Sequence, residues 1–358
     1  MMGGPMVRII VLLLCVLCGA GSNLLAEDRF ERITPEEVGY STEKLAELAA
    51  FLEERGSSAL LLVHDGKVFF EWGDIYRKHT VHSIRKALLN SVFGIHVARG
   101  DIDLDATLSE LGIDDIEPRL TEAEKQATVR HLIASRSGIY HAAAADNDGM
   151  HSAKPDRGSH APGAAYHYNN WDFNAAGTIF ERLADRSIYE AFYREIAVPL
   201  GMLHFRGTHA RVNSADPDAS IPDTDGFYQF EPARSRFPAY HFRLSAHDLA
   251  LYGQLYMNRG RWQGVQLVPA DWVDLSTKVH SVSNPRYGLG YGLLWGVLVP
   301  GDETTRPSFY HTGTNVHMLG VYPEHKLVMV HRVDTEHDYR FTEFDLYEII
   351  RLVHGARR

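Results

Sequence analysis

The amino-acid sequence predicts an α/β protein, because strand patterns lie near both ends of the chain and helical patterns fill the middle. Residues 59–70 form two apolar runs around Asp65-Gly66, a dipeptide typical of the two-residue turn in a β-hairpin. Residues 101–240 are dominated by helical and loop patterns. Three apolar runs in the last third of the chain predict further strands: 288–299, 309–322 and 327–333.

This order of patterns predicts two lobes. We expect an α/β lobe built from residues 27–100 and 245–358, and an inserted, mostly helical lobe at 101–244. Substrate clefts often lie at such lobe boundaries, so we expect the functional site there. Within the insert, residues 142–163 carry several Asp, His, Gly and Pro residues and predict a long ordered loop near that site.

Helices are predicted around these strands from apolar periodicity and from capping residues. Ser41 precedes the first of them and fits an N-cap. The helix after Ser83 is apolar on nearly every side, which indicates a buried central helix. The four predicted helices are 43–55, which ends at Gly56, 83–99, which ends at Gly100, 245–258 and 342–353.

Residues 1–26 have the layout of a cleavable signal peptide. Arg8 precedes an apolar run from Ile9 to Leu17 that is too short for a comfortable transmembrane span, and small residues follow at 19–22. The cleavage site could follow Ala20, Ser22 or Ala26, and the sequence does not decide among these three positions. This segment predicts a periplasmic or secreted protein with no stable membrane span in the mature chain.

Composition narrows the classes of partner. Both cysteines, Cys15 and Cys18, lie in the predicted signal segment, so the mature chain would have neither disulfides nor a catalytic thiol. The formal charge is −10 and no basic stripe is present, which argues against a nucleic-acid partner. We expect a small-molecule or peptide substrate; the oligomeric state is left open.

Ser83 and Lys86 are the most informative residues. A serine and a lysine three positions apart lie on one face of a helix, where an amine can reach and activate a serine nucleophile. Ser41-Thr42-Glu43-Lys44 has the same spacing, but Ser41 opens an amphipathic surface helix and is better explained as its N-cap.

Two further motifs follow Ser83 in order. Tyr168-Asn169-Asn170 is a Tyr-x-Asn motif, and His311-Thr312-Gly313 lies between apolar runs that indicate strands. Serine β-lactamases and penicillin-binding proteins combine Ser-x-x-Lys with a polar middle motif and a Lys-Thr-Gly strand. With Tyr-x-Asn in the middle position, the sequence resembles class C β-lactamases and related DD-peptidases, esterases and amide hydrolases.

The resemblance extends beyond the three motifs, from about Ile33 to the C-terminus. It implies a β-lactamase/transpeptidase-like fold, with an antiparallel sheet flanked by helices and an inserted, mostly helical lobe. The further segments that carry it are Val129–Gly138, Ser245–Ala250, Gly260–Trp262 and Pro269–Val273.

From the resemblance we expect a serine hydrolase in which Ser83 is acylated and water then releases the acyl group. Either Lys86 or Tyr168 would be the general base, a choice that the sequence leaves open. Asn170 would orient the acyl amide or ester and could hold Lys86. The backbone N–H groups of Ser83 and Thr314 would bind the oxyanion.

His311 departs from the family pattern, which mostly has lysine there. Because histidine is largely neutral at pH 7, the site lacks the fixed charge that holds the carboxylate of a penicillin. We therefore expect esters or amides without a carboxylate as the better substrates, with anionic ones gaining as His311 protonates at lower pH. A true β-lactamase or DD-peptidase, and a non-catalytic binding protein with the same fold, are the alternatives.

No cofactor is expected. The chain has 20 histidines, but none falls in a zinc-ligand spacing, and His141, His151, His160 and His167 are expected to be exposed or hydrogen-bonded loop residues. Asp146–Gly149 begins like a calcium loop, yet Arg157 stands where the closing glutamate is needed.

Overall fold

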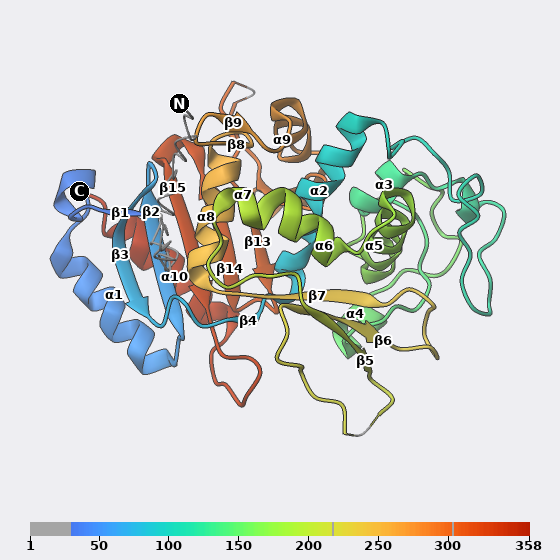
Figure 1. The fold of residues 1–358 in the computed structure, drawn as a ribbon, viewed down its shortest axis with the longest axis horizontal. Helices are drawn as coiled ribbons and strands as arrows, with labels where there is room; N and C mark the ends of the chain where they lie inside the picture. The colour runs from blue at the N-terminus through green and yellow to red at the C-terminus, as the bar shows by residue number, and fades with distance from the viewer. Residues whose placement is uncertain (1–29, 217, 303) are drawn as a thin grey trace, which may run out of the picture.

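A nine-stranded sheet forms the centre of the protein in a computed structural model that describes residues 30–216, 218–302 and 304–358 (Figure 1). Its strand order is β1-β3-β2-β15-β14-β13-β12-β11-β10. In chain order these strands are β1 (Glu31–Arg32), β2 (Ala59–His64), β3 (Lys67–Gly73), β10 (Ser281–Asn284), β11 (Leu289–Tyr291), β12 (Gly296–Leu298), β13 (Phe309–Gly313), β14 (His317–Tyr322) and β15 (Leu327–Arg332).

Strand β2 near the start of the chain pairs antiparallel with β15 near its end, in the register Leu62 opposite Met329. This pairing joins the two ends of the chain into one sheet. Every neighbouring pair in this sheet is antiparallel except β1 and β3, which run parallel. The predicted α/β class with a largely antiparallel sheet flanked by helices is therefore confirmed.

Helices cover both faces of the sheet (Figure 1). Helix α8 crosses β2, β14 and β15 on one face, while α1 and α10 pack together on the other. The α-helices are α1 (Thr42–Arg55), α2 (Arg85–Arg99), α3 (Val129–Ile133), α4 (Asp148–Ser152), α5 (Asn170–Ala184), α6 (Ile188–Phe192), α7 (Val198–Leu200), α8 (Ala246–Met257), α9 (Ala270–Ser276) and α10 (Glu343–Gly355).

Short turns of other helix types link these elements. The one that matters most for the site is η2 (His82–Ile84), a 3₁₀ turn that runs directly into α2. The remaining ones are the 3₁₀ turns η1 (Glu36–Val38), η3 (Glu124–Gln126), η5 (Pro285–Tyr287) and η6 (Pro323–His325), and the π-helical turn η4 (Tyr193–Ala197).

A second sheet, which the sequence patterns did not indicate, lies beside the helices of the inserted segment. Its strand order is β4-β7-β6-β5, and two further strands form a separate small hairpin. Residues 101–244 are thus not purely helical. The strands are β4 (His79–Thr80), β5 (His209–Asn213), β6 (Gly226–Phe230) and β7 (Ala239–Leu244), with β8 (Arg261–Trp262) and β9 (Val265–Gln266) in the hairpin.

The local predictions near the N-terminal side are confirmed. Ser41 caps α1 by accepting a hydrogen bond from the backbone N–H of Lys44, and α1 ends at Gly56. Asp65 and Gly66 both have positive φ, 48° and 80°, as the two-residue turn between β2 and β3 requires. These features depend on a few neighbouring residues, which explains why the sequence reveals them.

The predicted signal segment, residues 1–26, lies outside the described residues, and so do both cysteines. Within the part of the chain that the structure does describe, no helix combines the length and the apolar character needed to span a membrane.

Candidate active site

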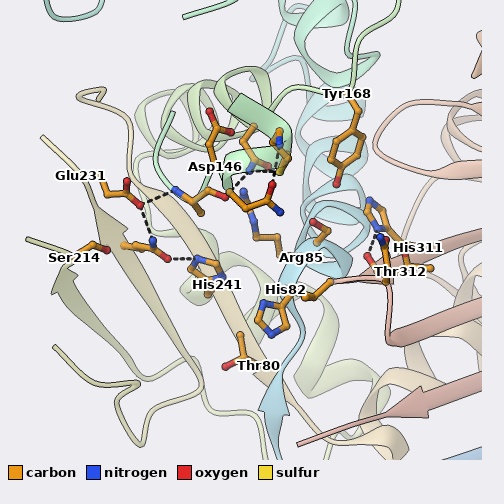
Figure 2. A pocket seen from close by; sticks show the side chains of 18 of the residues that line it. Thr80, His82, Arg85, Asp146, Tyr168, Ser214, Glu231, His241, His311 and Thr312 are labelled. Atoms are coloured by element: carbon orange, nitrogen blue, oxygen red, sulfur yellow. Dashed lines mark hydrogen bonds between the residues drawn. The ribbon is translucent and has the colours of Figure 1, made fainter. Parts of the chain in front are cut away.

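A cavity of about 1000 Å³ lies where the nucleophile turn, the second sheet and the edge of the central sheet meet. Ser83, Tyr168, Asn170 and His311 all line it, so the three sequence motifs converge there. Figure 2 shows Tyr168 and His311 on one side of the cavity and, on the other, His241 on β7 and Glu231, which directly follows β6. Residues from 145 to 150 close a third side; the predicted loop at 142–163 therefore lies at the cavity, but it is interrupted by the short helix α4 (Asp148–Ser152).

Lys86 contacts Ser83 directly. Its Nζ atom lies 2.8 Å from Ser83 Oγ, and the lysine side chain is buried between the Tyr168 and Phe173 rings, 4.8 Å from each centroid. Burial, with the Arg85 charge beside it, lowers the pKa of Lys86 well below the usual value. A neutral amine in this place can accept the serine proton.

The turn that presents Ser83 has an unusual backbone. His82 has φ 48°, a left-handed conformation that is uncommon for a residue with a side chain. Its ring is anchored from the far side: Nε2 lies 2.8 Å from the Thr335 hydroxyl and the ring stacks on His317 at 5.3 Å. These contacts hold the turn in a conformation that costs energy, of the kind often found at functional sites.

Tyr168 stands over the serine. Figure 2 shows its phenol pointing down toward η2. Burial raises the pKa of Tyr168 above its ordinary value, while a hydrogen bond with Ser83 acts in the opposite direction. The phenol therefore stays protonated at neutral pH. Tyr168 is therefore placed as a proton donor, and Lys86, in direct contact with Ser83 Oγ, is the better placed of the two to accept a proton first.

Asn170 does not contact Lys86 in the way that one of the two roles expected of it requires. Its Nδ2 donates to the Ala145 carbonyl at 2.9 Å and contacts the Met150 sulfur at 3.6 Å, with no hydrogen bond to Lys86. The Oδ1 atom is buried and has no hydrogen-bond partner among the described residues. Asn170 thus contacts the segment that runs from Ala145 into α4, and its Oδ1 is left as an acceptor that a ligand N–H could reach.

His311 is more buried than the sequence suggested. Its ring is 5% exposed, Nδ1 lies 2.9 Å from the Thr312 carbonyl, and Nε2 has no partner in the described part of the chain. Burial, reinforced by the nearby Lys86, lowers the pKa of His311 to about 3. The expected gain of anionic substrates as pH falls is not supported, because burial keeps the pKa of His311 too low for the ring to protonate in the mildly acidic range.

The close approach of β13 to η2 depends on Gly313. A Cβ atom at this position would lie 2.4 Å from the Val81 carbonyl oxygen, so a side chain would push the strand away. Thr312 and Thr314 line the cavity beside Ser83. Thr314 turns the chain after the strand with φ 50°. This arrangement brings the strand motif and the nucleophile to one edge of the cavity.

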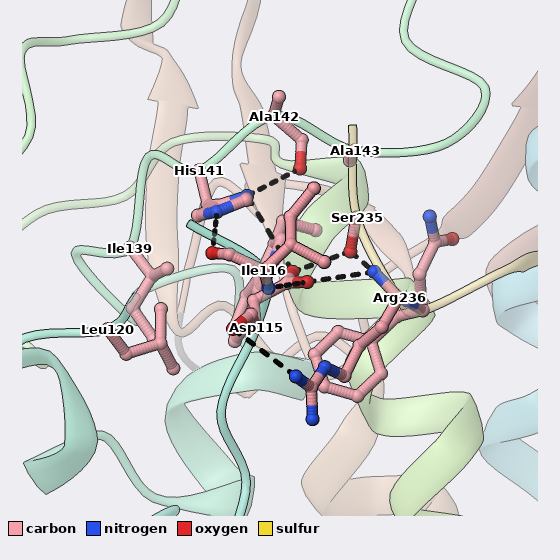
Figure 3. A network of polar contacts seen from close by, with 12 residues as sticks. Asp115, Ile116, Leu120, Ile139, His141, Ala142, Ala143, Ser235 and Arg236 are labelled. Atoms are coloured by element: carbon pink, nitrogen blue, oxygen red, sulfur yellow. Dashed lines mark hydrogen bonds and ion pairs between the residues drawn. The ribbon is translucent and has the colours of Figure 1, made fainter. Parts of the chain in front are cut away.

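A buried network supports the loop wall of the cavity (Figure 3). Asp115 is fully buried and accepts hydrogen bonds from the indole of Trp171 at 2.7 Å and the hydroxyl of Ser235 at 2.6 Å. His141 lies 3.6 Å from the same carboxylate. The network ties α5 to the segments on either side of the cavity, which gives His141 a structural role.

The described residues contain no group of three or more His, Cys, Asp or Glu side chains arranged to hold a metal ion. Asp146, at the start of the calcium-loop-like stretch, instead pairs with Lys154 at 2.6 Å. His160 accepts or donates a hydrogen bond at 2.9 Å with the Tyr140 hydroxyl.

Sequence reasoning missed two parts of the cavity. One is the wall formed by Gln229, Glu231 and His241 on and after β6 and on β7. No local pattern points to that wall, because a separate sheet brings it there. The other is Arg85, inside the nucleophile motif, which lines the cavity although it is only 2% exposed. A second cation beside Lys86, at the start of a helix whose first three turns are otherwise buried, was a signal that could have found it.

Four histidines cluster at the nucleophile turn, His82 within it and His79, His317 and His331 behind it, and we expect them to make the protein acid-sensitive. Burial, with the Arg332 charge nearby, lowers the pKa of His79, His82 and His331 to about 4 each. In the unfolded chain these rings protonate near pH 6.5. Between pH 6.5 and 5 the unfolded state therefore binds protons at these rings and the folded state does not. The free energy of unfolding falls by up to about 2 kcal/mol per histidine over this range.

Urea unfolding at pH 7.5, 6.5, 5.8 and 5.0 measures this loss. His331→Gln should flatten the fall in unfolding free energy, whereas His337→Gln should not, since the His337 side chain is 72% exposed. A wild-type unfolding free energy that stays constant from pH 6.5 to 5.0 would contradict the expectation.

The sheet, its covering helices and the converging motifs define a β-lactamase-like and penicillin-binding-protein-like serine hydrolase fold. A family model described as "Beta-lactamase" matches residues 46–352. The chain belongs to the β-lactamase family. No curated protein matches the chain in a sequence search.

Solved structures agree on the fold. A candidate 6-aminohexanoate-dimer hydrolase from Bacillus anthracis superposes with TM-score 0.64 at 16% identity, covering 91% of this chain and 86% of its own. A candidate β-lactamase from Bacteroides dorei DSM 17855 superposes with TM-score 0.63 at 18% identity, covering 88% of this chain and 99% of its own. A penicillin-binding protein from Bacillus halodurans superposes with TM-score 0.62 at 15% identity, covering 86% of this chain and 99% of its own. At these identities the likeness concerns the fold.

Proposed function

We propose that this protein is an exported serine hydrolase, of the class C β-lactamase-like type, that cleaves an ester or amide through an acyl-enzyme on Ser83. The observation that carries the proposal is the 2.8 Å contact between Lys86 Nζ and Ser83 Oγ at a cavity wall. The depressed pKa of Lys86 supports it, because only a neutral amine can take the serine proton.

In the proposed reaction Ser83 Oγ attacks the acyl carbon and its proton passes to Lys86. The oxyanion is stabilised by the backbone N–H groups of Ser83 and Thr314. Tyr168, protonated and next to Ser83, passes its proton to the leaving group, and the protonated Lys86 then returns a proton to the Tyr168 phenolate. Asn170 offers its free Oδ1 to the acyl portion of the substrate.

Water completes the cycle: it attacks the acyl carbon and gives a proton to Lys86, the bond to Ser83 Oγ breaks, and Ser83 Oγ regains that proton as the acid leaves. No cofactor takes part. Export rests on the sequence of residues 1–26, which favours a periplasmic or secreted enzyme. Neutral His311 in the place of the usual lysine favours an esterase or amidase over a true β-lactamase or DD-peptidase.

A fluorophosphonate probe tests the serine mechanism. We expect intact-mass spectrometry of the mature protein to show one added phosphonyl group, and peptide mapping to place it on Ser83. A panel of 4-nitrophenyl esters, D-amino-acid peptides and a chromogenic cephalosporin then separates esterase, peptidase and β-lactamase activity. A protein that takes up no probe and turns over no member of the panel would support the alternative of a non-catalytic binding protein.

A further inference from the structure

The cavity contains a buried cation that has no counter-ion among the described residues. Arg85 lies between the nucleophile and the catalytic lysine in sequence, and its side chain is 2% exposed yet lines the cavity. Its Nη2 donates to Asn174 Oδ1 at 2.9 Å and its guanidinium lies over the Tyr240 ring at 4.4 Å. Figure 2 shows it between the His241 wall and the Tyr168–His311 side.

Arg85 has unused binding capacity. Its Nη1 atom is buried and makes no hydrogen bond, and no carboxylate of the described residues forms an ion pair with it. An uncompensated buried charge is costly, and a protein normally pairs it. The fixed planar fork of a guanidinium suits a carboxylate in particular.

The other charges at the cavity are neutralised or exposed. Asp146 pairs with Lys154, and Glu231 pairs with Arg234 at 3.2 Å. Asp216 lies in an exposed segment. His311 on β13 carries no charge at neutral pH. Among the described residues that line the cavity, Arg85 is therefore the one unpaired cation, and a single cation matches a monoanion such as a carboxylate better than a phosphate dianion.

Arg85 lies on the α5 side of Ser83, away from β13. Its partner Asn174 follows Asn170 by four residues on α5, so the two amides share one face of that helix. The free Oδ1 of Asn170 is the acceptor assigned above to the acyl portion of the substrate. A group bound to Arg85 would belong to the same portion.

We propose that Arg85 binds a carboxylate on the acyl portion of the substrate, so that the protein prefers esters or amides whose acyl group ends in a carboxylate. This rests on the proposed serine hydrolase function. It reverses the sequence-based expectation of uncharged substrates, because the charge that His311 fails to supply comes from the nucleophile helix instead.

A matched pair of substrates tests the proposal: the half ester of adipic acid with 4-nitrophenol, and 4-nitrophenyl heptanoate. The ratio of kcat/KM for the anionic ester to that for the neutral ester should fall about tenfold to a hundredfold in Arg85→Met, the usual size for loss of a charge-assisted contact. Arg85→Lys should lie between the wild type and Arg85→Met, because it keeps the charge without the fork.

Arg234→Met is the control, since it removes a cation from the same cavity that already has a partner. Its ratio should change less than about threefold, the size of a screened surface charge effect. If the ratio of kcat/KM for the anionic ester to that for the neutral ester is unchanged in Arg85→Met, the proposal is overturned. This includes the case in which Arg85→Met changes the pKa of Lys86 and so shifts the pH profiles of both esters equally. An equal fall in Arg234→Met would also overturn the proposal.

Should Arg85→Met fail to fold, competitive inhibition of the wild type by butyrate and butyramide decides the question. We expect an inhibition constant at least about tenfold lower for butyrate, and equal constants would overturn the proposal. Fluorophosphonate labelling of Ser83 keeps the two hypotheses apart. Labelling with an unchanged ratio refutes the carboxylate site alone, whereas absence of labelling refutes the serine mechanism.

Discussion

Replacing Ser83 with alanine is expected to abolish both turnover and fluorophosphonate labelling. Alanine removes the oxygen that forms the acyl-enzyme, and removal of a catalytic serine costs on the order of 10⁴-fold or more in kcat. The side chain is small and lies at the cavity wall, so its loss leaves no large void in the core. Steady-state kinetics with the best ester of the panel and intact-mass spectrometry measure the two effects.

Ser41→Ala is the matched control, because Ser41-Thr42-Glu43-Lys44 has the same spacing but caps α1. It should keep near-full activity and lose about 1 kcal/mol of stability, the usual contribution of an N-cap. An inactive Ser41→Ala together with an active Ser83→Ala would reverse the assignment of the nucleophile.

Lys86→Arg is expected to be almost as damaging as Lys86→Ala, with a loss of roughly 10²–10⁴ in kcat/KM, the size of a general acid–base contribution. Arginine keeps a positive charge but does not give up its proton in a protein, so it cannot accept the proton of Ser83. Burial and the neighbouring Arg85 charge lower the pKa of Lys86 and so favour its neutral form, whereas an arginine in this place would remain a permanent cation.

The pH profile distinguishes a base from a structural residue. Because Lys86 must be neutral to act, wild-type kcat/KM should fall as pH drops through the depressed pKa of Lys86, and this acid limb should vanish from the residual activity of Lys86→Ala. Lys86→Met, which keeps most of the side-chain volume, controls for packing, and thermal unfolding checks that each variant folds. Retention of more than about a tenth of wild-type kcat/KM by Lys86→Arg would exclude proton acceptance by Lys86.

Several elements could be predicted because their causes are local. The turn at Asp65 and Gly66 needs two residues that tolerate positive φ, and the start of α1 needs one hydroxyl at Ser41. The contact of Ser83 with Lys86 follows from a spacing of three on a helical turn. Each of these patterns spans only a few residues, so it can be interpreted without knowledge of how the rest of the chain folds.

The second sheet was missed because its strands are short and mixed in polarity. The residues of β5 alternate between exposed and half-buried, and β5 obtains its partner β6 only after a connection of more than ten residues. Pairing of this kind is decided by long-range contacts, which a local pattern does not record. The cavity wall at Gln229 and His241 depends on that pairing and was missed with it.

The sequence by itself determined which groups could do chemistry: a serine and a lysine on one turn, a tyrosine and asparagine motif, and a histidine in the strand position. The tertiary structure decided their charge states. Burial by other elements lowers the pKa of Lys86 and of His311, and among the described residues the neighbours of Arg85 on α5 and β7 offer an amide and an aromatic ring instead of a carboxylate. Ionisation depends on desolvation and on charges from distant segments, and these exist only once the chain has folded.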